Sequence, residues 1–134
     1  MIRAQIAAVA AGVLVAGVAG FQLALALGLP LGEATLGGRA STTNGVLTGP
    51  FRLVAAVSAF VLILVAWIVL ARAGVVGSGP FGDTFVAWAT WTILVFLVLN
   101  TVANFAAPHP VERWVMGTIT LVIAGLVGIV ATRG

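Results

Sequence analysis

The sequence has no cysteine and no lysine, and it has few charged residues of either sign. The lack of thiols excludes disulfides, thiolate metal sites, iron–sulfur ligation and cysteine nucleophiles. Only nine of the 134 residues are charged, six arginines and three acidic residues, whereas 62% of the chain is hydrophobic. A soluble domain needs about a quarter of its residues charged to cover its surface. Lipid must therefore be the solvent for most of this surface.

The sparse charges and the single histidine exclude several functions. The arginines are spread along the chain and form no cluster that could follow a phosphate backbone, so we expect no nucleic-acid binding. His109 has no acidic or cysteine neighbours in a metal-ligand pattern, and its place between two prolines is typical of a loop or cap residue. The chain has no G-x-S-x-G motif. The sequence thus predicts a protein that is not an enzyme and needs no metal or cofactor.

Four apolar runs divide the chain, at residues 6–29, 53–71, 84–106 and 115–131. A helix over the 24 residues of the first run would be ~36 Å long, enough to cross a ~30 Å hydrocarbon core. Pro50 and Pro110 suit the first turn of a helix, so the second and fourth helices could begin before their apolar runs. We predict an all-α fold, in which residues 1–134 form one membrane domain, a bundle of four spanning helices with short loops.

The longest connection, residues 30–52, is rich in glycine and threonine. Gly37-Gly38 and Asn44-Gly45 indicate turns rather than a separate domain. The sequence leaves open whether this connection folds over the bundle.

The distribution of positive charge gives little information about the orientation in the membrane. Four spans put both termini on one side, called side A, and the opposite side is side B. Side A carries Arg3, Arg72 and Arg133, and side B carries Arg39, Arg52 and Arg113. This balance removes the bias that the positive-inside rule uses. The free amino group adds a positive charge to side A, so we predict cytoplasmic termini, with insertion in both orientations as the alternative.

A stripe of small residues occupies every fourth position of the first helix. Its members are Ala4, Ala8, Gly12, Ala16, Gly20, Ala24 and Gly28. Small residues at this spacing let two helix backbones approach closely, which drives helix association in lipid. Because a turn has 3.6 residues, the stripe drifts by ~40° per step and wraps around the helix. Gly117, Ala124 and Gly128 offer a match in the fourth helix. We predict that the first helix packs on the fourth helix or on a second copy of itself.

All four spans contribute uncharged polar residues to the half nearer side B, among them Gln22, Ser58, Asn100, Asn104, Thr118 and Thr120. Lipid cannot satisfy their hydrogen-bonding groups, so we expect them to point into the bundle, where Gln22 would meet Asn100 and Asn104. Two interpretations stay open: interhelical hydrogen bonds that hold the bundle together, or a polar cavity open to side B. No ionisable residue lies within the four runs, which argues against a proton antiporter.

The rim of the bundle at side B carries charged residues. They are Glu33, Arg39, Arg52, Glu112 and Arg113. Arg52 and Arg113 lie where helices enter the membrane, so we expect them to contact lipid phosphate groups. If Pro110 starts the fourth helix, Glu112 falls in its first turn, where the helix dipole favours a negative charge.

Two stretches carry a resemblance to a known group of proteins. Residues 25–38 read LALGLPLGEATLGG, and residues 100–117 contain Asn100, Asn104, Glu112-Arg113 and Met116-Gly117. With the composition, these stretches resemble small four-helix bacterial membrane proteins of uncharacterised function, of the kind found in actinobacteria. The resemblance implies a four-helix fold in the bacterial inner membrane and no particular activity. The chain lacks the embedded glutamate of small multidrug transporters and the Gly-Thr-Phe-Ser-rich third helix of fluoride channels, so no residues are carried over from either family.

These features favour a non-enzymatic accessory or scaffold subunit, which packs with itself or with a partner through Gly/Ala-rich helix faces. The partners would be the lipid bilayer and a homo-oligomer or larger membrane complex. Two alternatives stay open, a small-solute channel or transporter that works as an oligomer, and a lipid- or quinone-binding protein that uses the polar residues near side B.

Overall fold

Four long helices make up most of the computed structural model, which describes residues 2–134. They are α1 (Ile2–Ala26), α2 (Gly49–Arg72), α3 (Asp83–Phe105) and α4 (Gly117–Arg133), with a π-helical turn, η3 (Val111–Met116), directly before α4. With η3 counted into the fourth span, each helix is long and apolar enough to cross a membrane. The predicted all-α four-helix fold is confirmed.

The ends of the helices follow from proline and glycine. The second span begins at Gly49 with Pro50 in its first turn, and the fourth begins directly after Pro110. Proline suits these positions because the first turn leaves its N–H groups unpaired. The first helix ends at Ala26, three residues before its apolar run does. Gly28, with φ 113°, ends it by directing its own amide to the carbonyl of Leu25, 3.2 Å away.

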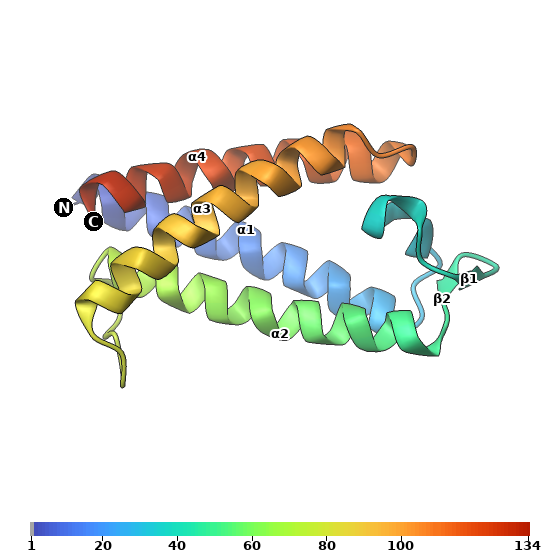
Figure 1. The fold of residues 1–134 in the computed structure, drawn as a ribbon, viewed down its shortest axis with the longest axis horizontal. Helices are drawn as coiled ribbons and strands as arrows, with labels where there is room; N and C mark the ends of the chain where they lie inside the picture. Colours follow the sequence, from blue (N-terminus) through green and yellow to red (C-terminus); the bar gives the residue numbers. More distant parts are fainter. Residues whose placement is uncertain (1) are drawn as a thin grey trace.

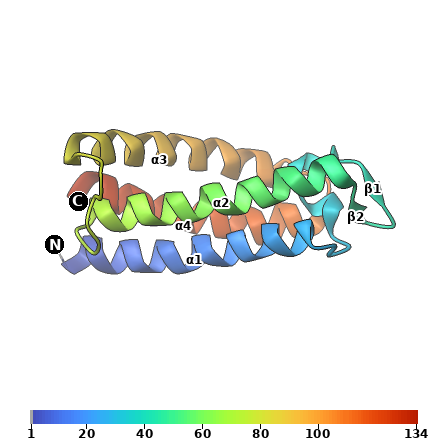
Figure 2. The same cartoon turned by 90° about the horizontal axis from the view of Figure 1, so that it is seen from below.

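The helices alternate in direction and form a closed bundle (Figure 1). α1 and α2 make one antiparallel hairpin, and α3 and α4 make a second. α4 also packs on α1, and α2 packs on α3, so each helix has two main neighbours, and α2 touches α4 as well. Figure 2 shows the same bundle from below, with α3 at one edge and α1 at the other. Both chain ends lie at side A, beside the connection between α2 and α3.

The main hydrophobic core lies among all four helices, and most of its members come from α1 and α4. Its buried residues on these two helices are Ala7, Ala8, Ala11, Val15, Ile123, Ala124, Val127 and Val130. α1 contributes mainly alanines, whose short side chains let the neighbouring backbones approach. α2 and α3 bury a smaller share of their residues than α1 and α4 do. Their large side chains, such as Phe60 and Phe96, are exposed on the surface that lipid would cover.

The connection between α1 and α2 folds back over the side B end of these helices. It contains two 3-10 turns, η1 (Gly32–Ala34) and η2 (Leu36–Gly38), and an antiparallel hairpin of β1 (Thr42–Thr43) and β2 (Val46–Leu47). Leu47 joins Leu25, Ala40 and Ala55 in a second, smaller core. The question that the sequence left open is answered, because this core ties the connection to both helices.

The hairpin turns at Asn44-Gly45, where the sequence indicated a turn. Both residues have positive φ, 52° and 82°, which a two-residue hairpin turn of this kind requires. Gly45 also packs closely against the backbone of Pro30, because a Cβ at position 45 would be 2.6 Å from the carbonyl oxygen of Pro30. The two short strands themselves were not predicted, since two residues are too few for a periodic pattern.

Labelling of introduced cysteines would test the predicted orientation. The chain has no cysteine, so an introduced cysteine is its only thiol. Ser41→Cys places this thiol at side B, and Gly77→Cys places it at side A. Both positions are exposed. With cytoplasmic termini, a membrane-impermeant maleimide added to intact cells labels Ser41→Cys and reaches Gly77→Cys only after the membrane is opened. The reverse pattern contradicts the prediction, and labelling of both in intact cells indicates both orientations.

The contact between α3 and α4 predicts that glycine is required at position 117. A Cβ on Gly117 would lie 2.8 Å from Cδ1 of Phe105, near the base of its ring. We expect Gly117→Ala to destabilise the bundle by ~1–3 kcal/mol through overpacking, measured by denaturant unfolding in detergent. Gly125→Ala is the matched control on the same helix, since a Cβ there would meet nothing within 4 Å. Equal effects of the two substitutions would contradict the close contact.

Candidate functional site

The polar residues near side B are joined in pairs rather than in one cluster. Nδ2 of Asn104 donates to Oγ1 of Thr120 at 3.3 Å, which links α3 to α4. Nε2 of Gln22 donates to Oγ1 of Thr35 at 3.5 Å, which links α1 to the folded-back connection. The predicted meeting of Gln22 with the two asparagines is not observed, because the connection supplies the partner of Gln22. Asn100 is half-buried one turn before Asn104 and takes part in neither pair.

The hydroxyl groups of the predicted cluster bond to their own helices. Oγ of Ser58 donates to the carbonyl oxygen of Val54 at 2.8 Å, and Oγ1 of Thr118 donates to that of Trp114 at 2.7 Å. Thr120 makes the same contact with Met116 at 2.8 Å while it accepts from Asn104. A hydroxyl that bonds four residues back is satisfied without a partner helix. Ser58 and Thr118 therefore need no polar cavity, and the prediction that Thr118 points into the bundle is wrong, because Thr118 is exposed.

Glu112 lies deeper than its position on the predicted rim suggests. It is 5% exposed, and it belongs to the π-helical turn that opens the fourth span. Its Oε1 accepts the backbone N–H of Gly37 at 3.0 Å, whereas its Oε2 is buried without a hydrogen-bond partner. Gly37 has φ 65°, a conformation that favours glycine. This hydrogen bond fastens the α1–α2 connection to the α3–α4 hairpin, and we call it the Glu112–Gly37 latch.

Two of the three rim arginines bond to backbone carbonyls within the protein. Nε of Arg52 donates to the carbonyl oxygen of Ala26 at 2.7 Å, and Nε of Arg113 donates to that of Ala107 at 3.0 Å. These are carbonyls at or just after helix C-terminal ends, which have no partner within the helix. Glu33 and Arg39 are exposed in the connection. Contact of the remaining guanidinium N–H groups with lipid phosphates stays a prediction.

The small-residue stripe turns away from the bundle along α1. Ala4 and Ala8 are buried, and a Cβ on Gly12 would meet the side chain of Leu70 on α2 at 3.7 Å. Ala16 and Gly20 are exposed, and a Cβ on Gly20 would meet nothing within 4 Å. Ala24 is half-buried and Gly28 ends the helix. The burial pattern follows the helical repeat of 3.6 residues, so a stripe with a repeat of four leaves the core after three turns.

The glycines of α4 pack against α3 instead of α1. A Cβ on Gly117 would meet Phe105, and one on Gly128 would lie 3.9 Å from the side chain of Leu94. Their predicted match to α1 is therefore not observed. Ala124 lies on the same face of α4, seven residues after Gly117 and four before Gly128, and it belongs to the main core.

Comparison with known proteins assigns this chain to no family, so its class rests on the fold. No family model matches the sequence, and no curated protein or solved structure is significantly similar to it. Among residues 2–134, no three His, Cys, Asp or Glu side chains are grouped so that they could hold a metal ion. The four apolar helices define a multi-pass membrane protein.

The Glu112–Gly37 latch predicts that Glu112→Ala frees the connection. A hydrogen bond to a charged group contributes ~1.5–3 kcal/mol, so we expect amide hydrogen exchange across residues 32–39 to rise about tenfold or more. Glu33→Ala removes the same side chain from an exposed position and should leave exchange unchanged. Equal exchange in the two variants would mean that the latch does not hold the connection.

Proposed function

We propose that this protein is a non-enzymatic accessory or scaffold subunit that associates with a second helix through the outer face of α1. The observation that supports the proposal is the position of Ala16 and Gly20, which are exposed in the middle of a membrane-spanning helix. Gly17 lies beside them, and a Cβ there would also meet nothing within 4 Å. Three small residues thus leave a shallow face that the helices of this chain do not cover.

Such a face suits a helix better than lipid chains alone. In lipid, two helices gain stability when their backbones come close enough for dense packing and weak hydrogen bonds. Larger side chains, Val13 and Leu23, border the small residues and are themselves exposed. A second helix that crosses at Gly20 can therefore pack its own ridge between these side chains, which is the packing that a scaffold or accessory subunit needs.

The side B residues support a structural role more than a transport path. Asn104 and Gln22 each have a partner within the protein, and Ser58 and Thr118 bond to their own helices. A path for a solute needs polar groups that are free to contact it. The hydrogen bonds of Asn104 and Gln22 hold α3 to α4 and the connection to α1.

Disulfide trapping in membranes would test the association. In the cysteine-free chain, Ala16→Cys puts one thiol on the proposed face. Two copies of a close crossing would bring these thiols within the 4–7 Å between Cα atoms that a disulfide spans. We expect an oxidant to convert Ala16→Cys to a covalent dimer, or to join it to one foreign polypeptide if the partner is another protein. Gly125→Cys, exposed on α4, should remain monomeric.

A second substitution makes the test specific. Gly20→Ile, added to Ala16→Cys, should lower the yield of the covalent product about fivefold or more, because overpacking costs ~1 kcal/mol or more. Gly125→Ile in the same background is the matched control and should leave the yield unchanged. Equal trapping of thiols at 16 and 125, or a yield that Gly20→Ile does not lower, would contradict the proposal.

A further inference from the structure

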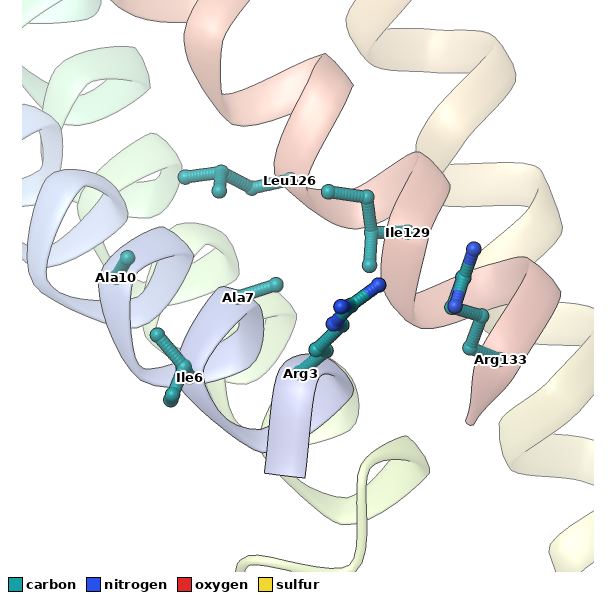
Figure 3. A pocket seen from close by; sticks show the side chains of 7 residues that line it. All are labelled: Arg3, Ile6, Ala7, Ala10, Leu126, Ile129 and Arg133. Carbon is teal, nitrogen blue, oxygen red and sulfur yellow. The ribbon is translucent and has the colours of Figure 1, made fainter. Parts of the chain in front are cut away.

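A groove opens between α1 and α4 at the side A end of the bundle (Figure 3). Its volume is about 380 Å³, and its lining residues come only from these two helices. They are Arg3, Ile6, Ala7, Ala10, Leu126, Ile129 and Arg133. The groove lies on a different part of α1 from the face around Gly20.

The body of the groove is apolar because two alanines face two larger side chains. Ala7 and Ala10 on α1 are too short to fill the space beside Leu126 and Ile129 on α4. From Arg3 to Ala10, and from Arg133 to Leu126, each helix runs seven residues, so the groove extends ~10 Å along the bundle. In a bilayer this depth reaches from the headgroup region into the hydrocarbon, where only an apolar chain is a stable occupant.

The mouth of the groove is positively charged. Arg3 lies in the first turn of α1 and Arg133 is the last residue of α4, and both are exposed at the same end of the bundle. Figure 3 shows both side chains at the end of the groove away from Ala10 and Leu126. No acidic residue lines the groove, so no carboxylate offsets the two arginines at its mouth.

We propose that this groove binds one anionic phospholipid. An acyl chain lies along the alanines and against Leu126 and Ile129, and the phosphate group sits between Arg3 and Arg133. The guanidinium groups supply the charge complementarity, since each arginine near an anionic headgroup favours binding. The apolar groove distinguishes a lipid from a free anion, because a free phosphate gains nothing from the alanines and contacts only two solvated side chains. The proposal does not depend on the association through Gly20.

Native mass spectrometry of the full chain in detergent would test this site. After removal of bound lipid, the protein is offered equal amounts of phosphatidylglycerol and phosphatidylcholine with the same acyl chains. We expect one phosphatidylglycerol to be retained in preference to phosphatidylcholine. Arg133→Gln should lower this occupancy about fivefold, the effect of losing one favourable charge at the headgroup. Arg39→Gln, which removes an equally exposed arginine at side B, should leave it unchanged.

A substitution inside the groove provides a second test that does not depend on charge. Ala10→Leu fills the space between the helices and should lower the retention of phosphatidylglycerol without any change in charge. Ala103→Leu makes the same substitution at an exposed position of α3 and is its control. Three results would each overturn the proposal: equal retention of the two lipids, an Arg39→Gln effect as large as that of Arg133→Gln, or displacement of the lipid by inorganic phosphate at matched concentration.

Discussion

The arrangement of this protein depends on one constraint: the hydrocarbon of a bilayer offers no hydrogen bonds, so polar groups within it are stabilised only by partners within the chain. The backbone meets this constraint by forming four helices. The hydroxyls of Ser58 and Thr118 meet it by bonding to carbonyls of their own helices. The side-chain amides of Gln22 and Asn104 carry more hydrogen-bonding groups than a hydroxyl does. Each of them bonds to a residue from a different element.

The two hairpins are joined at side B through the folded-back connection, and nearer side A through the main core and a hydrogen bond from Nη2 of Arg72 to the carbonyl oxygen of Ala131, 3.4 Å away. At side B, the Glu112–Gly37 latch and the contact of Gln22 with Thr35 connect the folded-back loop to both hairpins. Toward side A, the alanines of α1 bring its backbone close to its neighbours, and the main core forms there. At side B the connection is therefore held both by the smaller hydrophobic core and by these polar contacts.

Part of the site could be predicted from residue types, and part could not. The burial of Asn104 follows from the cost of an amide in lipid, but the partner of Gln22 could not be predicted, because Thr35 lies in a connection whose fold has no periodic pattern. Glu112 was expected at the rim, and its burial depends on a π-helical turn and on the positive φ of Gly37. The groove between α1 and α4 joins Arg3 to Arg133, from opposite ends of the chain, and no local pattern links them.

The sequence alone determined the class of this protein, since nine charged residues and four long apolar runs allow few folds other than membrane-spanning helices. It also determined the starts of the second and fourth spans, through Pro50 and Pro110 and the φ restriction that proline imposes. The tertiary structure decided which face of each helix is covered. Gly12 meets α2, Gly117 meets α3 and Gly20 is left outside, although all three look alike in the sequence. The reason is physical: a small residue permits close approach on any side, and only the packing of the other helices decides which side is used.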